Sequence, residues 1–335
     1  MDDLSVKIQG LFPKKRIVIV GDLVADQFLH GTISRVSREA PVFILRHDET
    51  DTRAGAASNA AVNISSLGAR PVLVGVLGDD ENGRLLLERL QGEGVDCDNV
   101  AIDASRKTTT KVRVLAGQHY AARQQVIRID YESPASIAEG VRRQMLTSLE
   151  READDADAIV ISDYNYGVAG RDLFDLALNI SKERSVPLLI DSRFRLNEFK
   201  GATTATPNQD EVEQLLGTGF SDEECSKLRE ELGLQSLLVT CGNKGMLLFE
   251  NDKPMVSLPA VGPSEPVDVT GAGDTVIAAY ALGLASGLTY PEAADVANHA
   301  GGIVVMKKGT AAVSLTELLE SIRNNAGPHS LESTA

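Results

Sequence analysis

The sequence predicts an α/β fold with a mostly parallel β-sheet covered by helices on both faces. Three observations predict it. Short apolar runs recur along the chain, amphipathic segments of helical length lie between most of them, and the composition of 43% apolar and 24% charged residues is that of a globular protein. A chain of 335 residues suits one large domain of this class, or two small ones, and can bury a sizeable core.

The predicted strands are short and end in polar residues. The strand-like runs cover residues 16–22, 71–77, 158–162, 186–191 and 236–240, and helical segments such as 136–152 and 170–184 lie between them. The polar residues at or just after predicted strand ends are Asp22, Asp163, Asp191, Asn208 and Gly242. Ligands bind at the carboxyl ends of the strands in such sheets, so the active site is expected there.

Two segments, 31–53 and 108–131, break this alternation. They are rich in Thr, Val, Ile and Arg and have no helical period, which predicts antiparallel strands outside the main sheet. A small sheet beside the strand ends would form a lid over the site, and its exposed edge would favour a homodimer through the lid.

The C-terminal third is predicted to be helical over 271–286, 291–307 and 314–324. No linker divides the chain, so one domain is expected over 12–325, followed by a tail over 326–335.

The charge balance excludes several classes of protein. With 33 basic and 48 acidic residues the net charge is −15, which argues against binding nucleic acid or an anionic membrane. The apolar stretch 276–285 is too short to span a bilayer, and the N-terminus has no apolar signal core. Three widely spaced cysteines indicate a reduced, cytoplasmic protein.

The strongest chemical signal is the segment Asp268-Val-Thr-Gly-Ala-Gly-Asp274, followed at once by an Ala-rich stretch. Glycines at a helix start expose backbone N–H groups, which bind anions and phosphate above all. A carboxylate at that place is useful if it takes a proton from an attacking hydroxyl while the N–H groups hold a transferring phosphoryl. The alternative is that Asp274 is only a helix-start carboxylate favoured by the dipole.

Two further glycine-rich blocks precede this segment. Residues 54–63 begin a helix of small residues, which close packing alone would explain, but the amide of Asn59 is suited to bind a sugar hydroxyl. Residues 75–83 form a strand-to-helix turn, and we expect its acidic residues to cap the next helix.

In order and spacing, the three motifs resemble the signatures of the ribokinase/phosphofructokinase-B sugar kinase family over about residues 17–310. The resemblance implies a ribokinase-like three-layer αβα sandwich with a β lid, ATP as donor and Mg²⁺ as the ion. It implies that Asp274 is the catalytic base and that Gly271, Ala272 and Gly273 form the anion hole for the γ-phosphoryl.

The resemblance also implies a nucleotide and metal site. Asn208 and Glu211 match an Asn-x-x-Glu pattern that helps to place Mg²⁺, with Glu211 acting through water, although helix capping is an alternative role for Asn208. The expected cofactor-binding residues are Asn208, Glu211, Thr240, Gly242, Lys244, Gly245, Asn298 and Gly301. Whether a monovalent cation binds near residues 308–310 stays open.

The acceptor is indicated by segments 31–42, 109–114, 125–130 and 162–167, which look like those of bacterial heptose 7-phosphate kinases. This implies phosphorylation of D-glycero-β-D-manno-heptose 7-phosphate at the anomeric O1, giving the 1,7-bisphosphate for the lipopolysaccharide core. Arg38 and Cys241 depart from that pattern, which often has Pro and Arg there. The expected substrate-binding residues are Asp26, Gly55, Asn59, Arg35, Arg38, Lys111, Arg113 and Asp163.

An acceptor that already carries phosphate needs a cation in its pocket. The lid segments offer Arg35, Arg38, Lys111, Arg113, Arg123 and Arg128, each of which is alternatively a solvated charge on an outward face. Asp191, Arg193 and Arg195 follow a strand end and could also approach the site.

Other functions remain open at this stage. The same fold could phosphorylate ribose, fructose 6-phosphate or a nucleoside, and a non-enzymatic sugar- or nucleotide-binding regulator is the least favoured because Asp274 is present. A fused form of the heptose kinase carries a nucleotidyltransferase domain with a His-x-Gly-His motif. That motif is missing here, so a kinase-only bacterial protein is expected.

Overall fold

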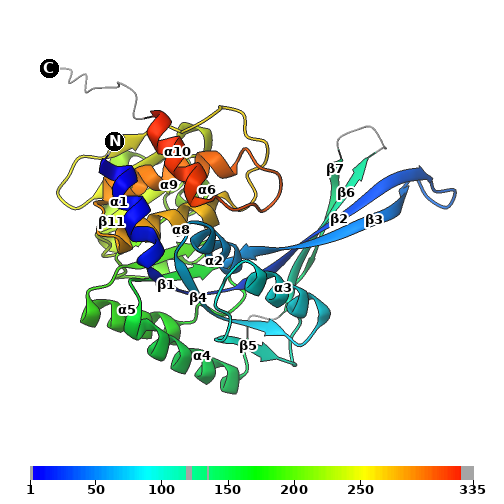
Figure 1. Cartoon of the computed structure of the whole chain (residues 1–335), viewed down its shortest axis with the longest axis horizontal. Coiled ribbons are helices and arrows are strands. Elements are labelled where there is room, and N and C mark those ends of the chain that lie inside the picture. Colours follow the sequence, from blue (N-terminus) through cyan, green and yellow to red (C-terminus); the bar gives the residue numbers. More distant parts are fainter. Residues whose placement is uncertain (1–2, 118–122, 134–135, 326–335) are drawn as a thin grey trace.

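The computed structural model describes residues 3–117, 123–133 and 136–325 and contains two β-sheets with helices packed around the larger one (Figure 1). The predicted tail, 326–335, lies outside the described residues, as does part of the predicted lid segment 108–131.

The central sheet has nine strands within the described residues, in the order β13-β12-β11-β10-β9-β8-β1-β4-β5. They are β1 (Arg16–Gly21), β4 (Arg70–Gly78), β5 (Val100–Asp103), β8 (Ala158–Asp163), β9 (Leu188–Ser192), β10 (Thr204–Ala205), β11 (Ser236–Thr240), β12 (Met246–Glu250) and β13 (Val256–Leu258). The strands from β5 to β11 pair in parallel, and β12 and β13 continue the sheet antiparallel. The mostly parallel sheet is therefore confirmed.

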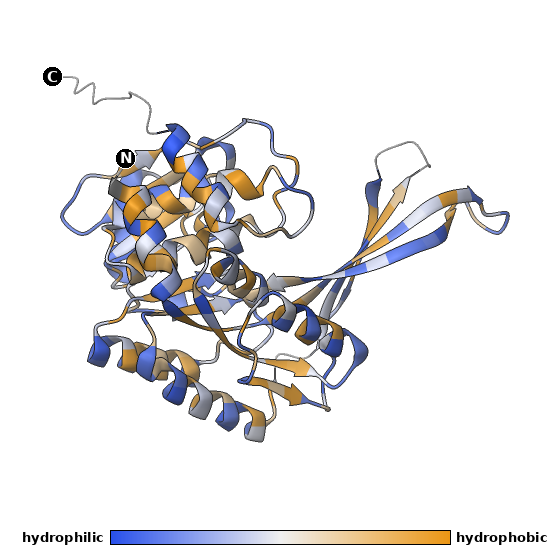
Figure 2. Cartoon of the chain, viewed as in Figure 1, coloured by the Kyte–Doolittle hydropathy of each residue, from blue (hydrophilic) through white to orange (hydrophobic). Residues whose placement is uncertain are grey.

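Two apolar cores lie on opposite faces of this sheet. In β1, Ile17 and Ile19 belong to one core and Val18 and Val20 to the other, and all four are fully buried. Successive side chains of a strand point to opposite faces, so a strand buried on both sides is an unbroken apolar run. Figure 2 shows these hydrophobic strands between helices of mixed hydropathy.

The helices form the two outer layers of the predicted three-layer sandwich. One layer contains α1 (Asp3–Leu11), α2 (Ala57–Ser66), α3 (Glu81–Gly92), α8 (Ala272–Ala285), α9 (Tyr290–Val304) and α10 (Leu315–Asn325). The other contains α4 (Glu139–Glu152), α5 (Arg171–Arg184), α6 (Gln209–Leu216) and α7 (Asp222–Glu231). Helix α1 buries Ile8 in the first core, so the folded domain begins before the expected residue 12. Among the described residues, no helix has both the length and the apolar character needed to cross a bilayer.

The second sheet is the lid, which projects from the body in Figure 1. Its strands are β2 (Leu23–Val36), β3 (Phe43–Ala56), β6 (Thr109–Gly117) and β7 (Gln124–Tyr131), in the order β3-β2-β6-β7. The hairpin of β2 and β3 begins and ends closer to the body than the expected 31–53.

The expectation of antiparallel pairing throughout the lid is wrong for one pair, because β2 and β6 are parallel. Between β3 and β6 the chain passes through β4, α3 and β5 of the body, and it therefore enters the lid from the same end as β2.

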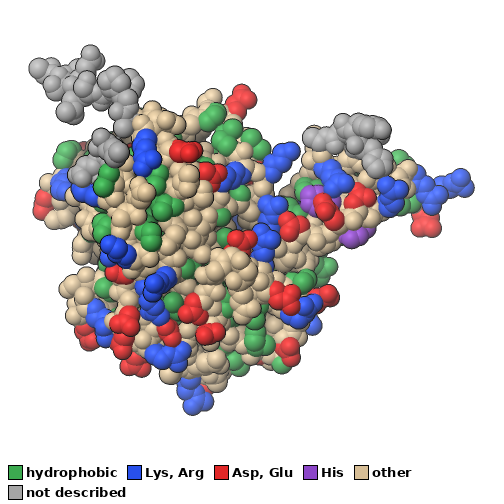
Figure 3. All heavy atoms as spheres, in the orientation of Figure 1, with side chains coloured by type: hydrophobic (Ala, Val, Ile, Leu, Met, Phe, Trp, Pro, Cys, Tyr) green, Lys and Arg blue, Asp and Glu red, His purple; other side chains and the backbone are tan. Residues whose placement is uncertain are grey.

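The two faces of the lid differ in character. Directly paired residues of neighbouring strands share a face, which places Phe28, Arg113 and Arg128 on one side. The other side carries Leu29, Val114 and Ile127 at the adjacent positions. In Figure 3, basic and acidic side chains lie intermixed on the lid and beside its junction with the body.

Candidate active site

The start of α8 lies at the carboxyl-end edge of the sheet. There the Ala272 N–H donates to the Val269 carbonyl at 3.2 Å, while the N–H groups of Gly271 and Gly273 have no partner among the described residues. Gly271, the N-cap residue, has φ +78°, and a Cβ there would lie 2.5 Å from Nδ2 of Asn59. Only glycine suits that backbone and that close approach. Gly271 has no side chain to cap the helix, and a Cβ on Gly273 would meet no described atom within 4 Å. The helix start therefore combines open space with two unpaired backbone donors among the described residues, those of Gly271 and Gly273, as anion binding requires.

Asp274, in the first turn of α8, is only 3% exposed and accepts two side-chain hydrogen bonds. Its Oδ1 accepts from the hydroxyl of Tyr164 at 2.9 Å, and its Oδ2 accepts from Nδ2 of Asn59 at 2.8 Å. Burial raises the pKa of Asp274 to about 7, an effect that the hydrogen bonds from Asn59 and Tyr164 oppose and the charge of Asp26 reinforces. A carboxylate of this kind exchanges a proton near neutral pH, as a general base must.

Asn59 is held by the packing of α2. The residues from Ala57 to Ile64 are buried, and Nδ2 of Asn63 donates to the Asn59 carbonyl at 3.0 Å. The small residues pack α2 against α8 and the sheet. The amide of Asn59, which we expected at a sugar hydroxyl, is thus directed at the carboxylate of Asp274.

Asp26, on β2, is the second buried carboxylate of the site. Its Oδ1 lies 2.5 Å from Nη1 of Arg113, and a Cβ on Gly55 would lie 2.9 Å from its Oδ2, so glycine allows the close approach of β3. Burial raises the pKa of Asp26, although the charge of Arg113 opposes this. The geometry brings Asp26, Gly55 and Arg113 together at the base of the lid, as expected.

Two further carboxylates are those of Asp191, at the carboxyl end of β9, and Glu211, in the first turn of α6. Burial and the charges of Asp274 and Glu211 raise the pKa of Asp191 well above its ordinary value, and burial also raises the pKa of Glu211. Two recessed carboxylates with raised pKa values are stabilised by a divalent cation, and Mg²⁺ prefers such oxygen ligands. The described residues hold no group of three or more metal-ligating side chains, so phosphates and water would complete the shell of an ion here.

Asn208 and Glu211 form a capping box at the start of α6. Oδ1 of Asn208 accepts from the Glu211 N–H at 2.9 Å, and Oε2 of Glu211 accepts from the Asn208 N–H at 2.9 Å. The capping alternative for Asn208 is therefore present in the structure. The second carboxylate oxygen of Glu211 remains available for another ligand.

A cavity of about 180 Å³ lies beside the start of α8. Of the expected cofactor-binding residues, those that line it are Thr240, Gly242, Gly245, Asn298 and Gly301, together with Ala272 and Gly273 of the anion hole. Its other walls are largely apolar and include Met246, Val261 and Val305, which suits a flat heterocyclic base. Lys244 is exposed on the same loop and does not line the cavity.

Three residues expected at the substrate lie elsewhere. Asp163 is fully buried, and its carboxylate pairs with Arg195 at 2.5 Å and accepts from the Ser192 hydroxyl at 2.7 Å. Its charge is thus used inside the protein, at the end of β8. Arg35 and Arg38 are exposed at the far end of the lid hairpin, where β2 turns towards β3.

The residue that we did not expect is Tyr164, whereas Asp22 and Asp191 were expected near the site only as polar residues at strand ends. Tyr164 lies in the segment 162–167 that indicated the acceptor, and the other two lie at predicted strand ends, but nothing in the sequence shows that a tyrosine hydroxyl reaches Asp274. That contact depends on the packing of the loop after β8 against α8.

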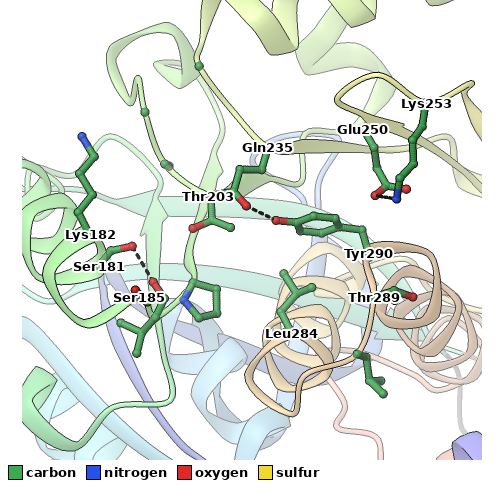
Figure 4. A pocket seen from close by; sticks show the side chains of 16 residues that line it. Ser181, Lys182, Ser185, Thr203, Gln235, Glu250, Lys253, Leu284, Thr289 and Tyr290 are labelled. Carbon is green, nitrogen blue, oxygen red and sulfur yellow. Dashed lines mark hydrogen bonds and ion pairs between the residues drawn. The ribbon is translucent and has the colours of Figure 1, made fainter.

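A larger cavity, of about 670 Å³, lies near the opposite ends of the strands (Figure 4). Its polar groups are paired with one another: the Tyr290 hydroxyl donates to Gln235 at 2.6 Å, and Lys253 bonds Glu250 at 2.8 Å. Because Thr203 and Gln235 precede β10 and β11, this cavity lies at the amino-end edge of the sheet. It therefore lies away from the start of α8 and from Asp274.

Comparison with known proteins finds relatives of this chain over nearly its whole length. The pattern of the pfkB family carbohydrate kinases matches residues 14–317. The chain is 37% identical over 324 residues to the bifunctional protein HldE of Geobacter metallireducens, and 39% identical over 327 residues to that of Alcanivorax borkumensis. Each alignment covers 94% of this chain but 65% of the relative, so the chain spans just under two thirds of their length.

Solved structures share the fold at lower identity. A ribokinase of Arabidopsis thaliana, in complex with ribose and ATP, has a TM-score of 0.71 at 21% identity, covering 92% of this chain and 98% of its own. Phosphofructokinase-2 of Escherichia coli, in complex with potassium, has a TM-score of 0.72 at 18% identity, with the same coverage.

Proposed function

Because the chain belongs to the pfkB family of carbohydrate kinases, and is therefore a sugar kinase that uses ATP, we propose that its acceptor is D-glycero-β-D-manno-heptose 7-phosphate. The reaction would transfer the γ-phosphoryl of ATP to the anomeric O1 and give the 1,7-bisphosphate and ADP. The lid and loop segments that resemble heptose 7-phosphate kinases support this acceptor, as does the similarity to bifunctional HldE proteins over 94% of the chain.

The observation that carries the proposal is the pairing of a buried carboxylate with an open helix start. In the proposed step, Asp274 accepts the proton of the O1 hydroxyl as the oxygen attacks the γ-phosphorus, and the bond between phosphorus and the bridging oxygen to ADP breaks. The N–H groups of Gly271 and Gly273 stabilise the charge on the transferring phosphoryl, while that of Ala272 donates to the Val269 carbonyl at 3.2 Å. Asp26 and Asn59 border the acceptor side of Asp274, and the cavity beside α8 takes the nucleotide.

Mg²⁺ belongs to the same proposal. Glu211, with Asp191 beside it, would hold the ion, which supplies positive charge against the phosphate oxygens of the nucleotide. A monovalent cation near residues 308–310 is a further possibility of the proposal. There the carboxylate of Asp268 accepts the N–H groups of Thr270 and Gly309 at 3.0 and 2.8 Å and fixes the turn.

The cation proposed to receive the acceptor's own phosphate is Arg193. The lid cations nearest the site are already paired, Arg113 with Asp26 and Lys111 with Asp130 at 3.2 Å. Arg193 is exposed just after β9, its charge acts on Tyr164 and Asp191, and it forms no ion pair with any residue that the structure describes. An unpaired guanidinium at the rim of the site suits a phosphate.

A homodimer through the lid and a location in the bacterial cytoplasm complete the proposal. The lid face that carries Leu29, Val114 and Ile127 is the apolar one, and Ile127 is 54% exposed. A second copy of the chain would cover this face while leaving the charged face towards the site. The cytoplasm supplies the ATP that the reaction needs.

A panel of acceptors tests the proposed substrate. In a coupled assay of ADP release, heptose 7-phosphate should give the highest kcat/KM among heptose 7-phosphate, ribose, fructose 6-phosphate and adenosine. Turnover of ribose or a nucleoside without turnover of heptose 7-phosphate would refute the acceptor and leave the membership of the kinase family intact. ATP binding without ADP release from any sugar would favour the regulator instead.

A further inference from the structure

The loop after β8 is held to the body by a buried carboxylate that accepts its N–H groups and by arginine side chains that donate to its carbonyls. Asp22, 1% exposed at the end of β1, accepts the backbone N–H groups of Tyr164, Tyr166 and Val168 at 2.8, 3.0 and 3.0 Å. Three such bonds to one carboxylate set the course of residues 164–168 and leave the loop little freedom. The hydrogen bonds to Asp22 therefore fix the backbone from which each tyrosine ring of this loop extends.

Tyr164 directs its hydroxyl at Asp274, with 2.9 Å between the oxygens. Burial raises the pKa of Tyr164 well above its ordinary value, and the charges of Asp274 and Asp191 raise it further, against a smaller opposing effect of Arg193. The phenol thus keeps its proton at any working pH and donates it in the hydrogen bond to the carboxylate.

The surroundings of Asp274 otherwise disfavour its charge. Around it, α2 contributes the neutral amide of Asn59, while β2 and β9 contribute the carboxylates of Asp26 and Asp191. Burial and the charge of Asp26 favour the protonated acid, which cannot accept a proton. The hydrogen bonds from Asn59 and Tyr164 are the two contacts that favour the ionised form, one on each oxygen.

We propose that Tyr164 is a positioning residue of the kinase, whose hydroxyl keeps the carboxylate of Asp274 ionised and in one orientation. The inference rests on the proposed role of Asp274 as the base. Tyr164 reaches the reacting atoms only through Asp274, and Asn59 remains to hold the other oxygen when Tyr164 is replaced.

Tyr166, two residues along the same loop, provides a matched control. Its hydroxyl accepts from Nζ of Lys111 at 2.9 Å and donates to Glu132 at 2.8 Å, so it contacts the lid side of the site and not Asp274. Replacing either tyrosine by phenylalanine removes one oxygen atom and keeps the ring. The two variants therefore differ in which partner loses its hydrogen bond.

The test compares Tyr164→Phe, Tyr166→Phe and the unsubstituted kinase from about pH 5.5 to about pH 9.5, with whichever acceptor is turned over. Tyr164→Phe should move the acidic limb of kcat/KM up by about one pH unit, a loss of about tenfold on the acid side that largely recovers at high pH. Tyr166→Phe should leave that limb in place.

Infrared spectroscopy supplies a readout that does not need turnover. The C=O band of the protonated Asp274 acid, identified by its absence in Asp274→Asn, should persist about one pH unit higher in Tyr164→Phe. An unshifted limb and band, or an equal loss at every pH, would overturn the inference. If no sugar is turned over, the proposed function fails, and the infrared band still decides on Tyr164.

Discussion

At the scale of the residue, the account depends on how the protein treats one carboxylate. Asp274 is buried, and desolvation opposes its charge. The hydrogen bonds from Asn59 and Tyr164 replace only part of the stabilisation that water would give the ionised carboxylate. A base whose pKa lies near the working pH gains efficiency from this arrangement. The same arrangement makes the folded state less stable when Asp274 is ionised.

The stability of the protein should therefore fall as Asp274 ionises. Because its folded pKa is raised from 3.8 to about 7, the folded state holds this proton more tightly than the unfolded state, and its stabilising effect is lost as pH rises through about 7. Asp274→Asn carries no charge to desolvate. Its Tm should match that of the unsubstituted protein at pH ~4 and exceed it by roughly 2–6 °C at pH ~8 in calorimetry.

Asp80→Asn serves as the control with the opposite sign. Although burial opposes it, hydrogen bonds from Thr108 and Gly83 hold the pKa of Asp80 below its usual range, so its charge stabilises the fold near neutral pH. A constant Tm difference between Asp274→Asn and the unsubstituted protein across this pH range would contradict the raised pKa.

The sequence could predict several of the residues that belong to the site, but not which side chains they contact. The motif predicted Asp274, Gly271 and Gly273 as candidates, because glycines at a helix start expose anion-binding N–H groups, but it left open that Asp274 is only a helix-start carboxylate. The sequence could not show that Asp163 forms an ion pair with Arg195, since that pair joins residues 32 positions apart through the packing of two strand ends. For the same reason it could not reveal Tyr164.

At the scale of the element, helices α6, α7 and α9 all begin with a capping box, but not all of them lie beside the site. α6 has the capping box of Asn208 and Glu211, and α7 has that of Ser221 and Glu224. Only the first lies beside Asp191 and the site. A glutamine preserves a capping box, so it separates the charge of the glutamate from its structural role.

Glu211→Gln should raise the Mg²⁺ concentration for half-maximal activity by about tenfold, with little change in Tm, because it removes a carboxylate ligand and keeps the cap. Glu224→Gln should change neither quantity. Titration of activity with Mg²⁺ at saturating ATP makes the measurement. The same Mg²⁺ dependence in both variants would show that Glu211 only caps its helix.

The bounds of the strands could be predicted from the sequence where burial produces a clear apolar run. β11 has the bounds that the sequence predicts, because its three central residues form a run that is fully buried on both faces of the sheet. The lid strands extend further than predicted, since residues 23–30 combine the apolar run of a body strand with the pairing of a lid strand. The two-residue strand β10 is too short to leave a pattern.

At the scale of the whole molecule, the two faces of the lid differ in role: one faces the site, and the other is the face proposed for the dimer. The face with Asp26, Lys111 and Arg113 lies towards the site, and the other face carries Ile127, which is 54% exposed, beside the buried Val114. Alternation along each strand makes this division possible. The sequence predicted a lid, but the parallel β2–β6 pair that aligns these faces depends on the path of the chain through the body.

Ile127→Asp should convert the proposed dimer into a monomer, because it places a charge in the apolar face that the second copy would cover. Light scattering should give about twice the chain mass of 35.7 kDa for the unsubstituted protein and one chain mass for the variant. Ile102→Asp, at a residue that is 49% exposed on β5 outside the lid, should leave the mass unchanged. A monomeric unsubstituted protein would refute the lid dimer.

The account as a whole depends on the Asp274 carboxylate accepting the acceptor's proton beside an intact anion hole. Its most direct test is a single-turnover measurement of ADP formation by Asp274→Asn, paired with ATP binding by calorimetry. We predict that ATP binds with unchanged affinity while the rate falls by about 10²–10⁴-fold. A rate within about tenfold of the unsubstituted enzyme, with ATP bound, would contradict the central claim.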